Sequence, residues 1–267
     1  MQVEICQHSQ ATVRIVDIQE ILDYNYCSNL YRLKYLNEQV EENLTDKYDK
    51  TLRKCFYAYL NMLKNNSSVE VNYLTRLWGK YWIKDKSTLK LMTKASANSR
   101  DKYDVLRKSG IDSLISFHDM IKIGEQYPIL VGKEYRVNIT PTIILTGKFE
   151  YIREFNLGGD NHVFQIIKFN CKKDKYLTMH QMRHDLELTA MDYAFQSLFK
   201  IDEPQQMVYA NIYKEKFVPS YRNQKDFEIL KQTVINTVKC ITNEIYNISP
   251  DSKCFMCSYR NQCQEQL

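Results

Sequence analysis

Four cysteines near the two ends of the chain are the residues whose type and spacing say most about chemistry. Three of them, Cys254, Cys257 and Cys263, lie in the run CFMCSYRNQC with C-x2-C-x5-C spacing. The fourth, Cys27, precedes them by more than two hundred residues. Thiolates gathered in fours hold zinc or an iron–sulfur cluster. A metal group shared by all four would therefore tie the first helix to the last segment.

The spacing alone leaves the metal and its fourth ligand open. The C-terminal run could instead be a zinc knuckle completed by Cys240 or by one of the five histidines. Disulfides are disfavoured, because the opening MQVEICQHSQ is polar and eight cysteines in 267 residues are too few for a disulfide scaffold. The thiols outside the set of four, which are Cys6, Cys55, Cys171 and Cys240, are expected to be buried or incidental.

The composition is that of a globular protein with a sizeable core, because 44% of the residues are hydrophobic. Without an apolar run of about eighteen residues, no membrane-spanning helix is predicted. The net charge of +5 permits a polyanion partner without demanding one. Twenty tyrosines, with many Asn, Lys and Ile residues, are typical of an AT-rich genome. We therefore expect a cytoplasmic protein of a bacterial host or a phage-infected cell.

The elements that must position these cysteines are predicted to be helices, then a sheet, then helices again. Apolar residues at helical spacing predict helices over 17–40, 46–64, 69–83 and 99–122. Alternating and β-branched residues predict strands over 127–131, 135–139, 142–155 and 162–170, with turns at 132–133 and 157–160. A helix over 176–199, a strand over 207–213 and an amphipathic helix over 225–246 follow. We expect a helical region over 1–125 and a sheet core over 126–267, joined by the metal group into one cooperative unit.

Three stretches resemble a known family. Cys27 and the NLYRLKYL that follows are similar to the C-P-x-x-[YF]-x-x-x-Y-L helix of RecB-like nucleases in the PD-(D/E)xK superfamily. LTGKFE, which ends at Glu150, resembles the L-x-G-x-[IV]-D strand, and 164–173 resembles the V-V-x-D-Y-K-T-G-K-x strand. The resemblance is greatest to the groups with an iron–sulfur clamp, the AddB nuclease domain and the CRISPR-associated RecB-like exonucleases.

The resemblance implies an α/β (α+β) fold with a mixed central sheet flanked by helices, a restriction-endonuclease-like core and an N-terminal helical subdomain. It implies that the four cysteines hold a 4Fe–4S cluster, with zinc as the alternative. It also implies DNA and other subunits of a replication, repair or recombination complex as partners. The candidate DNA contacts are basic residues around the central strands, Lys148, Lys172, Lys173 and Lys175.

The nuclease centre that the resemblance implies departs from the family pattern. Cleavage requires two carboxylates that hold Mg or Mn and a lysine that activates water. On a strand, the second acid and the lysine must lie two residues apart to share a face. Glu150 can stand for the first acid and Lys168 for the lysine, which leaves Ile166 in the place of the second acid. A shifted register puts Lys168 at the acid position and Asn170 at the lysine position.

Two acids on the following helix could supply the missing carboxylate. Asp185 and Glu187 could reach a metal from that helix, or they could form a solvated helix face. Glu150 and Lys168 could equally be an ion pair left where a metal once sat. The leading hypothesis is a degenerate nuclease homologue that acts as a DNA-binding or scaffold subunit. An active metal-dependent DNA exonuclease with a migrated carboxylate is the alternative, and a zinc-stapled interaction protein is a third.

Overall fold

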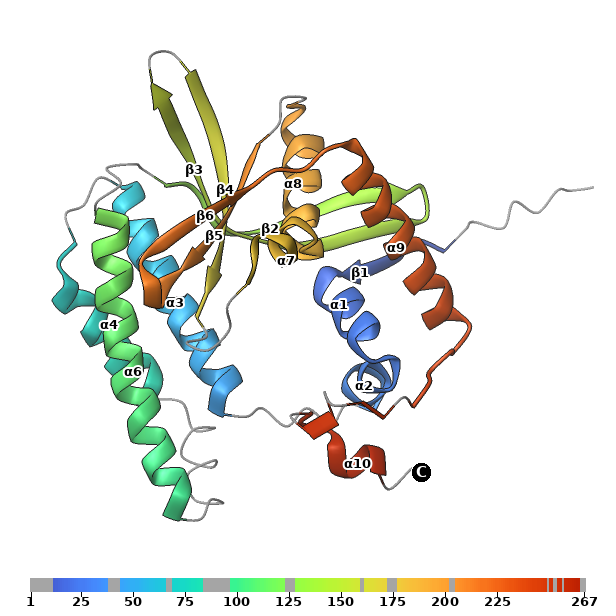
Figure 1. Ribbon diagram of the computed structural model, residues 1–267, viewed down its shortest axis with the longest axis horizontal. Coiled ribbons are helices and arrows are strands. Elements are labelled where there is room, and N and C mark those ends of the chain that lie inside the picture. Colours follow the sequence, from blue (N-terminus) through green and yellow to red (C-terminus); the bar gives the residue numbers. More distant parts are fainter. Residues whose placement is uncertain are drawn as a thin grey trace, which may run out of the picture.

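The computed structural model describes residues 12–37, 44–65, 69–83, 97–122, 128–158, 161–171, 177–201, 205–248, 250–251, 254–255 and 257–264. A six-stranded mixed sheet lies at the centre (Figure 1). Its order is β1-β3-β4-β5-β6, and β2 pairs with β3. The β1–β3 and β4–β5 pairs are parallel, and the others are antiparallel. The strands are β1 (Arg14–Asp17), β2 (Pro128–Thr140), β3 (Ile143–Gly158), β4 (Asn161–Asn170), β5 (Gln206–Asn211) and β6 (Lys216–Ser220).

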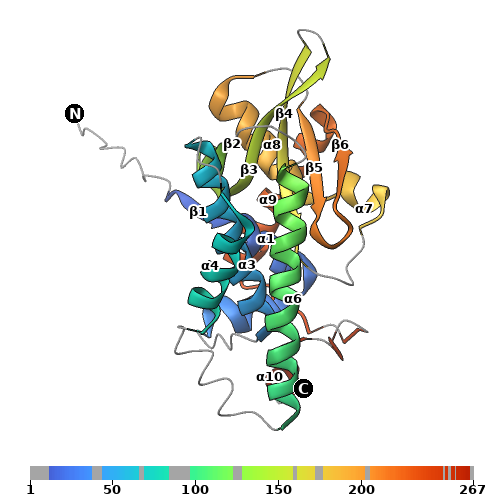
Figure 2. The ribbon, with the colours of Figure 1, turned by 90° about the vertical axis from the view of Figure 1, so that its left-hand side faces the viewer.

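Helices cover both faces of this sheet. One layer consists of α3 (Leu44–Lys64), α4 (Val71–Ile83) and α6 (Ala97–Lys122), which lie in front of the strands in Figure 2. The other consists of α1 (Ile18–Tyr26), α8 (Leu186–Phe199) and α9 (Gln224–Thr242). Shorter elements complete the chain, namely α2 (Ser28–Tyr31), the π-helix η1 (Arg32–Leu36), α7 (Met179–Arg183), the 3₁₀-helix η2 (Ile212–Lys214) and α10 (Arg260–Gln264). The expected mixed α/β fold is confirmed.

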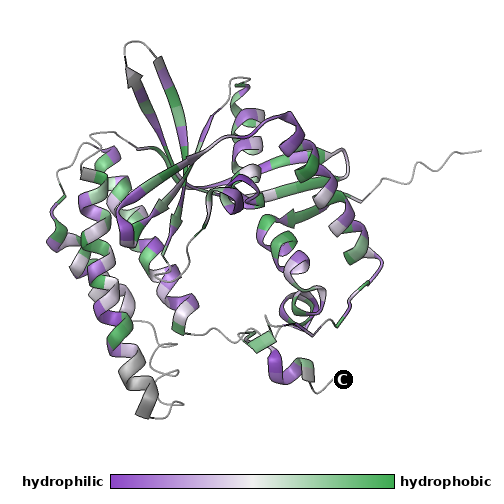
Figure 3. Ribbon diagram, in the orientation of Figure 1, coloured by the Kyte–Doolittle hydropathy of each residue, from purple (hydrophilic) through white to green (hydrophobic). Residues whose placement is uncertain are grey.

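Each layer buries its own hydrophobic core against the sheet. On the side of α3 and α6, the rings of Phe56 and Phe117 stack with centroids 3.9 Å apart, and both meet Phe169 of β4 edge-on. On the other side, Leu188 of α8 and Leu230 of α9 pack in one cluster with strand residues. In Figure 3 the helices alternate hydrophobic and hydrophilic residues, as amphipathic helices packed on a sheet must.

Several predicted elements differ from the observed ones for identifiable reasons. The turn predicted at 132–133 is wrong, because β2 runs through it and both neighbours of Gly132 stay paired with β3. Gly132 adopts a φ of 58°, which a glycine tolerates inside a strand as an irregularity. The single helix predicted over 176–199 is broken into α7 and α8, with Asp185 capping α8. The strands β1 and β6 were not predicted, because each has only four or five residues.

The two ends of the described chain lie side by side. In Figure 1, α10 lies next to α2, although more than two hundred residues separate them in sequence. The Tyr24 hydroxyl donates to the carbonyl of Ile245 at 2.5 Å, and the Ser28 hydroxyl accepts from the backbone N–H of Asn247 at 2.9 Å. These contacts hold the C-terminal segment against the first helices. None of the described helices is both long enough and apolar enough to span a lipid bilayer.

Candidate functional site

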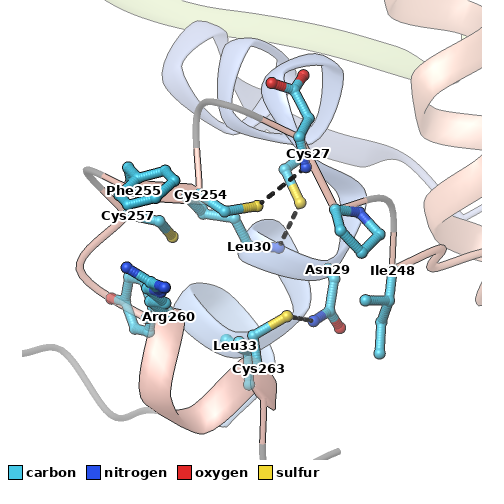
Figure 4. Close-up of a pocket in the computed structure, with 13 residues that line it drawn as sticks. Cys27, Asn29, Leu30, Leu33, Ile248, Cys254, Phe255, Cys257, Arg260 and Cys263 are labelled. Atoms are coloured by element: carbon cyan, nitrogen blue, oxygen red, sulfur yellow. Dashed lines mark hydrogen bonds between the residues drawn. The ribbon is translucent and has the colours of Figure 1, made fainter. Parts of the chain in front are cut away.

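The four cysteines singled out by the sequence line one cavity. Cys27 comes from the junction of α1 and α2, and Cys254, Cys257 and Cys263 come from the C-terminal segment. The cavity has a volume of about 220 Å³ and a mostly apolar lining that includes Leu30, Leu33 and Ile248 (Figure 4). The chain fold therefore brings together all four predicted ligands.

The thiols are close enough to influence one another. Burial raises the pKa of Cys257 most, and the neighbouring thiols Cys27, Cys254 and Cys263 raise it further. Within the described part of the chain, no set of three or more His, Cys, Asp or Glu side chains is closed around a single metal ion. The sulfur atoms thus surround a cavity and do not converge on one ion-sized point.

A second cluster of charged residues lies where β3 and β4 meet α3 and α8. Glu150 of β3 is buried, and both of its carboxylate oxygens have partners. One oxygen accepts from the guanidinium of Arg53 on α3, and the other accepts from the backbone N–H of Phe169 at 2.5 Å. Arg53 also donates to Asp49 at 2.7 Å and to the carbonyl oxygen of Phe169 at 3.1 Å. A guanidinium thus joins two carboxylates and a backbone carbonyl.

Lys168 of β4 binds the two acids of the neighbouring helix. Its ammonium lies 2.9 Å from Asp185 and 2.6 Å from Glu187. Asp185 is also the N-cap of α8 and accepts from the backbone N–H of Leu188 at 2.9 Å. Glu187 follows in the first turn of the same helix, where the helix dipole favours an acid. The pairing of Lys168 with Glu150, one of the alternatives from sequence, is not among the observed ion pairs.

The electrostatics of this second cluster follow from its burial. Burial alone would lower the pKa of Lys168, but the carboxylates of Glu187 and Asp185 outweigh it and hold that pKa above its ordinary value. Burial would raise the pKa of Asp185, but the Lys168 ammonium and the N–H of Leu188 hold it below its ordinary value. Arg53 is likewise held in its charged form, because Cys171 and Asp49 raise its pKa against the effect of burial. All three groups are therefore ionised at neutral pH.

The β3–β4 register bears on Ile166, the residue that the first alignment puts in the place of the second acid. In the β3–β4 ladder Tyr151 pairs with Ile167 and Ile152 pairs with Ile166. Continuing this antiparallel register by one residue would set Glu150 against Lys168. Ile166 is fully buried, in the same hydrophobic cluster as residues of α8. On β4, neither alignment therefore supplies a second acid, because the first has Ile166 at that position and the shifted one has Lys168.

Basic residues gather beside this cluster. A hollow of about 350 Å³ is lined by Glu150, Glu187 and a set of basic and aromatic residues, Lys50, Arg53, Lys54, Tyr57 and Lys148. Lys148 lies over the ring of Tyr57, 5.0 Å from its centroid. Glu187 also lines two adjoining hollows of about 450 and 590 Å³. The other predicted DNA contacts, Lys172, Lys173 and Lys175, lie outside the described residues.

Arg53 is the residue of this cluster that the sequence analysis missed. The sequence predicts a helix over 46–64 that contains Arg53, but it indicates no site residue on that helix. The Asp49–Arg53 pair at i, i+4 was visible as a charge pattern, but such pairs usually lie on solvated helix faces. Nothing in the sequence indicated that this face of α3 packs against the β3–β4 edge.

Comparison with known proteins supports the fold. A crystal structure described as a "Putative exonuclease" from Eubacterium rectale is 10% identical and has a TM-score of 0.51, over 98% of this chain and 93% of that chain. A second solved structure, SSO0001, is 14% identical over 94% of this chain and 97% of that chain, but its TM-score of 0.32 carries no argument. No curated protein matches the chain.

The assignment of the chain to a family rests on a sequence match, and the mixed sheet with its flanking helices agrees with it. The family model of the PD-(D/E)XK nuclease superfamily matches residues 129–264, which run from β2 to α10 and include Glu150, Lys168 and the three C-terminal cysteines. The chain belongs to the PD-(D/E)XK nuclease superfamily.

Proposed function

We propose that this protein is a catalytically degenerate nuclease homologue that binds DNA as a subunit of a nucleic-acid-processing complex, and that its four cysteines hold a 4Fe–4S cluster. The observation that carries the loss of catalysis is the position of Arg53. Its guanidinium binds Glu150, Asp49 and the carbonyl oxygen of Phe169. Carboxylate and carbonyl oxygens are the ligands that Mg²⁺ takes in such sites. An organic cation therefore uses the oxygens that a metal ion would need.

Lys168 supports the same conclusion from the other side of the cluster. A catalytic lysine must be free to position a water molecule or to meet the scissile phosphate. Here its ammonium is held by both Asp185 and Glu187, and only 17% of the side chain is exposed. Both acids are thus engaged by one ammonium group. Arg53 and Lys168 thus hold the three candidate carboxylates, and Asp49 besides, as ion pairs.

One observation favours the alternative of an active exonuclease. Asp185 and Glu187 lie directly beside Lys168, so a migrated acid and a lysine are adjacent in the cluster. For this arrangement to cleave DNA, a divalent ion would have to displace Arg53 from Glu150. The cost of moving a half-buried, paired guanidinium makes this the second candidate.

DNA binding is supported by the family and by the basic hollow. Lys50, Lys54 and Lys148 line one side of the charged cluster, where a phosphate backbone would meet them. Binding that depends on such lysines carries little sequence preference and weakens steeply as salt rises.

The proposed 4Fe–4S cluster is supported by the four cysteine donors and by the cavity that they line. Four cysteine side chains are the usual ligands of a 4Fe–4S group. A single zinc ion at about 2.3 Å from each sulfur would bring the sulfurs within roughly 4 Å of one another. Here the thiols border a cavity of about 220 Å³. Such a cluster would join α2 to α10 and supply a structural cross-link.

Cleavage and DNA binding are tested together on the cluster-loaded protein. Labelled single- and double-stranded oligonucleotides are incubated with the full chain in Mg²⁺ or Mn²⁺, and binding is measured by fluorescence anisotropy at about 50 mM and 200 mM salt. We expect binding that weakens with salt, without cleavage. Robust cleavage that Asp185→Ala or Glu187→Ala abolishes would establish the exonuclease instead. No binding to either oligonucleotide would leave a scaffold role only.

The metal group is tested by anaerobic purification and metal analysis. We expect brown protein with four irons and four sulfides per chain. Colourless protein with one zinc per chain would contradict the cluster and leave the four cysteines as zinc ligands.

A further inference from the structure

Each of the four cysteine sulfurs receives one N–H group. The backbone N–H of Leu30 points to Cys27 at 3.5 Å and that of Asp251 points to Cys254 at 3.4 Å. The backbone of Tyr259 donates to Cys257. The fourth donor is a side chain, the amide of Asn29, whose Nδ2 lies 3.2 Å from the Sγ of Cys263 (Figure 4).

Asn29 is held in place by burial. It is the second residue of α2, two positions after Cys27, and only 1% of its surface is exposed. Its carbonyl oxygen has no hydrogen-bond partner among the described residues. A buried amide is costly unless its polar atoms are satisfied, so the contact with sulfur must contribute to keeping an asparagine here. A thiolate would strengthen that contact, because hydrogen bonds to charged acceptors are shorter and stronger.

We propose that Asn29 is a positioning residue for the metal group, which orients Cys263 and raises the reduction potential of the cluster. The inference rests on the proposed 4Fe–4S cluster. Reduction adds negative charge that spreads onto the cysteine sulfurs, and an N–H dipole aimed at a sulfur stabilises this charge. The three backbone donors do the same, but Asn29 is the one donor of the four that a substitution can remove.

The experiment uses the full chain reconstituted with iron and sulfide under anaerobic conditions. Asn29→Leu keeps the approximate shape of the side chain and removes the N–H, whereas Asn29→Gln retains an amide donor. We expect the Leu variant to have a lower reduction potential in an EPR-monitored titration. In competition with a ferrous chelator, we also expect it to hold iron about 10 to 100 times less tightly, the usual effect of losing a partner of a metal ligand. The Gln variant should recover part of both properties.

The matched control is Ser28→Ala, one residue earlier on the same helix. Ser28 binds the backbone of Asn247 and no sulfur. It should lower thermal stability without changing the potential. An equal potential shift in Ser28→Ala and Asn29→Leu would reduce Asn29 to a structural role and overturn the proposal.

A measurement on the unaltered protein covers the case in which Asn29→Leu does not fold. With asparagine labelled by ¹⁵N in the side chain, pulsed EPR of the reduced cluster should detect a ¹⁵N coupling. Absence of the ¹⁵N coupling would overturn the role of Asn29 and leave the proposed cluster unaffected. The same conclusion would follow if the Asn29→Leu variant binds a cluster and keeps the reduction potential and iron retention of the unaltered protein. Failure of the unaltered protein to take up iron overturns the cluster itself, and this inference with it.

Discussion

At the scale of single residues, the proposed degenerate centre keeps its carboxylates and pairs them with Arg53 and Lys168. A divalent ion and a guanidinium both need oxygen ligands, but the guanidinium takes them through directed N–H bonds in a plane. Asp49, Glu150 and the carbonyl of Phe169 provide those bonds to Arg53. Removing the guanidinium should leave a set of oxygens that a hard cation can use.

Arg53→Ala is therefore expected to bind Mn²⁺ at least about tenfold more tightly than the unaltered protein, a gain of roughly 1.4 kcal/mol. The free Mn²⁺ signal in EPR measures this directly. Adding Glu150→Gln should remove the gain, because it takes away a charged ligand. Arg107→Ala on the exposed side of α6 is the matched control. Equal Mn²⁺ affinity in Arg53→Ala and Arg107→Ala would contradict the role of Arg53.

Lys168→Met should destabilise the protein, because it leaves Asp185 and Glu187 without their cation. Breaking a largely buried pair costs about 3 kcal/mol. The Lys168 ammonium lowers the folded-state pKa of Asp185, so its contribution is present above the unfolded value of about 3.9 and is lost as the pH falls through the folded value. The stability deficit of the variant should thus be largest near neutral pH and shrink below about pH 4. Urea unfolding between about pH 3 and pH 7 measures this deficit, with Lys239→Met at an exposed position as the control. A deficit that does not change with pH would contradict the pairing of Lys168 with Asp185 as its cause.

Among these residues, sequence reasoning found the acids and the lysine but not their partners. Glu150, Lys168, Asp185 and Glu187 carry recognisable types at recognisable places, and the structure brings them near one another. Which acid pairs with which cation depends on how α3 and α8 approach the β3–β4 edge, and this is a tertiary property. The four cysteines were easier, because a short C-x2-C spacing already restricts where the ligands can lie.

At the scale of elements, the packing of α4 against α6 depends on one glycine. A Cβ atom built on Gly110 of α6 would lie 2.2 Å from the indole of Trp78 on α4. Trp78 in turn stacks on Trp82, with ring centroids 5.0 Å apart, so the indole has little room to retreat. The close crossing of the two helices therefore requires the absence of a side chain at this position.

Gly110→Ala should destabilise the protein by about 1–3 kcal/mol, the usual cost of overfilling a packed core. Gly79→Ala on α4 is a matched control in the same helix pair, because a Cβ there meets nothing within 4 Å. That control should be neutral or stabilise by up to about 1 kcal/mol, because alanine is the better helix former. Thermal melts followed by circular dichroism compare the two. A Gly110→Ala protein as stable as Gly79→Ala would show that the crossing can relax.

The long helices and strands were predictable because their apolar period is sustained over many residues. The expected helix over 46–64 corresponds to α3 at Leu44–Lys64, and the expected strand over 162–170 to β4 at Asn161–Asn170. The strand β1 was not predictable, because a four-residue strand has too few positions to show an alternation of apolar and polar residues. Its parallel pairing with β3 is a contact between residues more than a hundred positions apart, which local pattern does not encode.

For the whole molecule, the four cysteines lie where the two ends of the described chain meet. Without a metal group, the C-terminal segment is attached to α1 and α2 by contacts such as those of Tyr24 and Ser28. A cluster bound by Cys27 and Cys254 would close a loop that contains most of the chain. Closing so long a loop removes conformational freedom from the unfolded state, and the entropy model values this at roughly 4–5 kcal/mol.

Cys27→Ser and Cys257→Ser are accordingly expected to unfold roughly 10 °C below the loaded unaltered protein, on the usual scale of about 2–4 °C per kcal/mol for a domain of this size. Metal binding adds to the effect, because the unfolded chain does not preassemble the site. Cys240→Ser is the matched control, since that thiol lies on α9 outside the cavity. Anaerobic calorimetry with and without an iron chelator separates the stabilisation by the cluster cross-link from the stabilisation by side-chain packing. The unaltered protein treated with chelator should unfold at the same temperature as the Cys27→Ser variant loaded with iron and sulfide. If all three loaded variants unfold at one temperature, the two ends of the chain are held by side-chain packing alone.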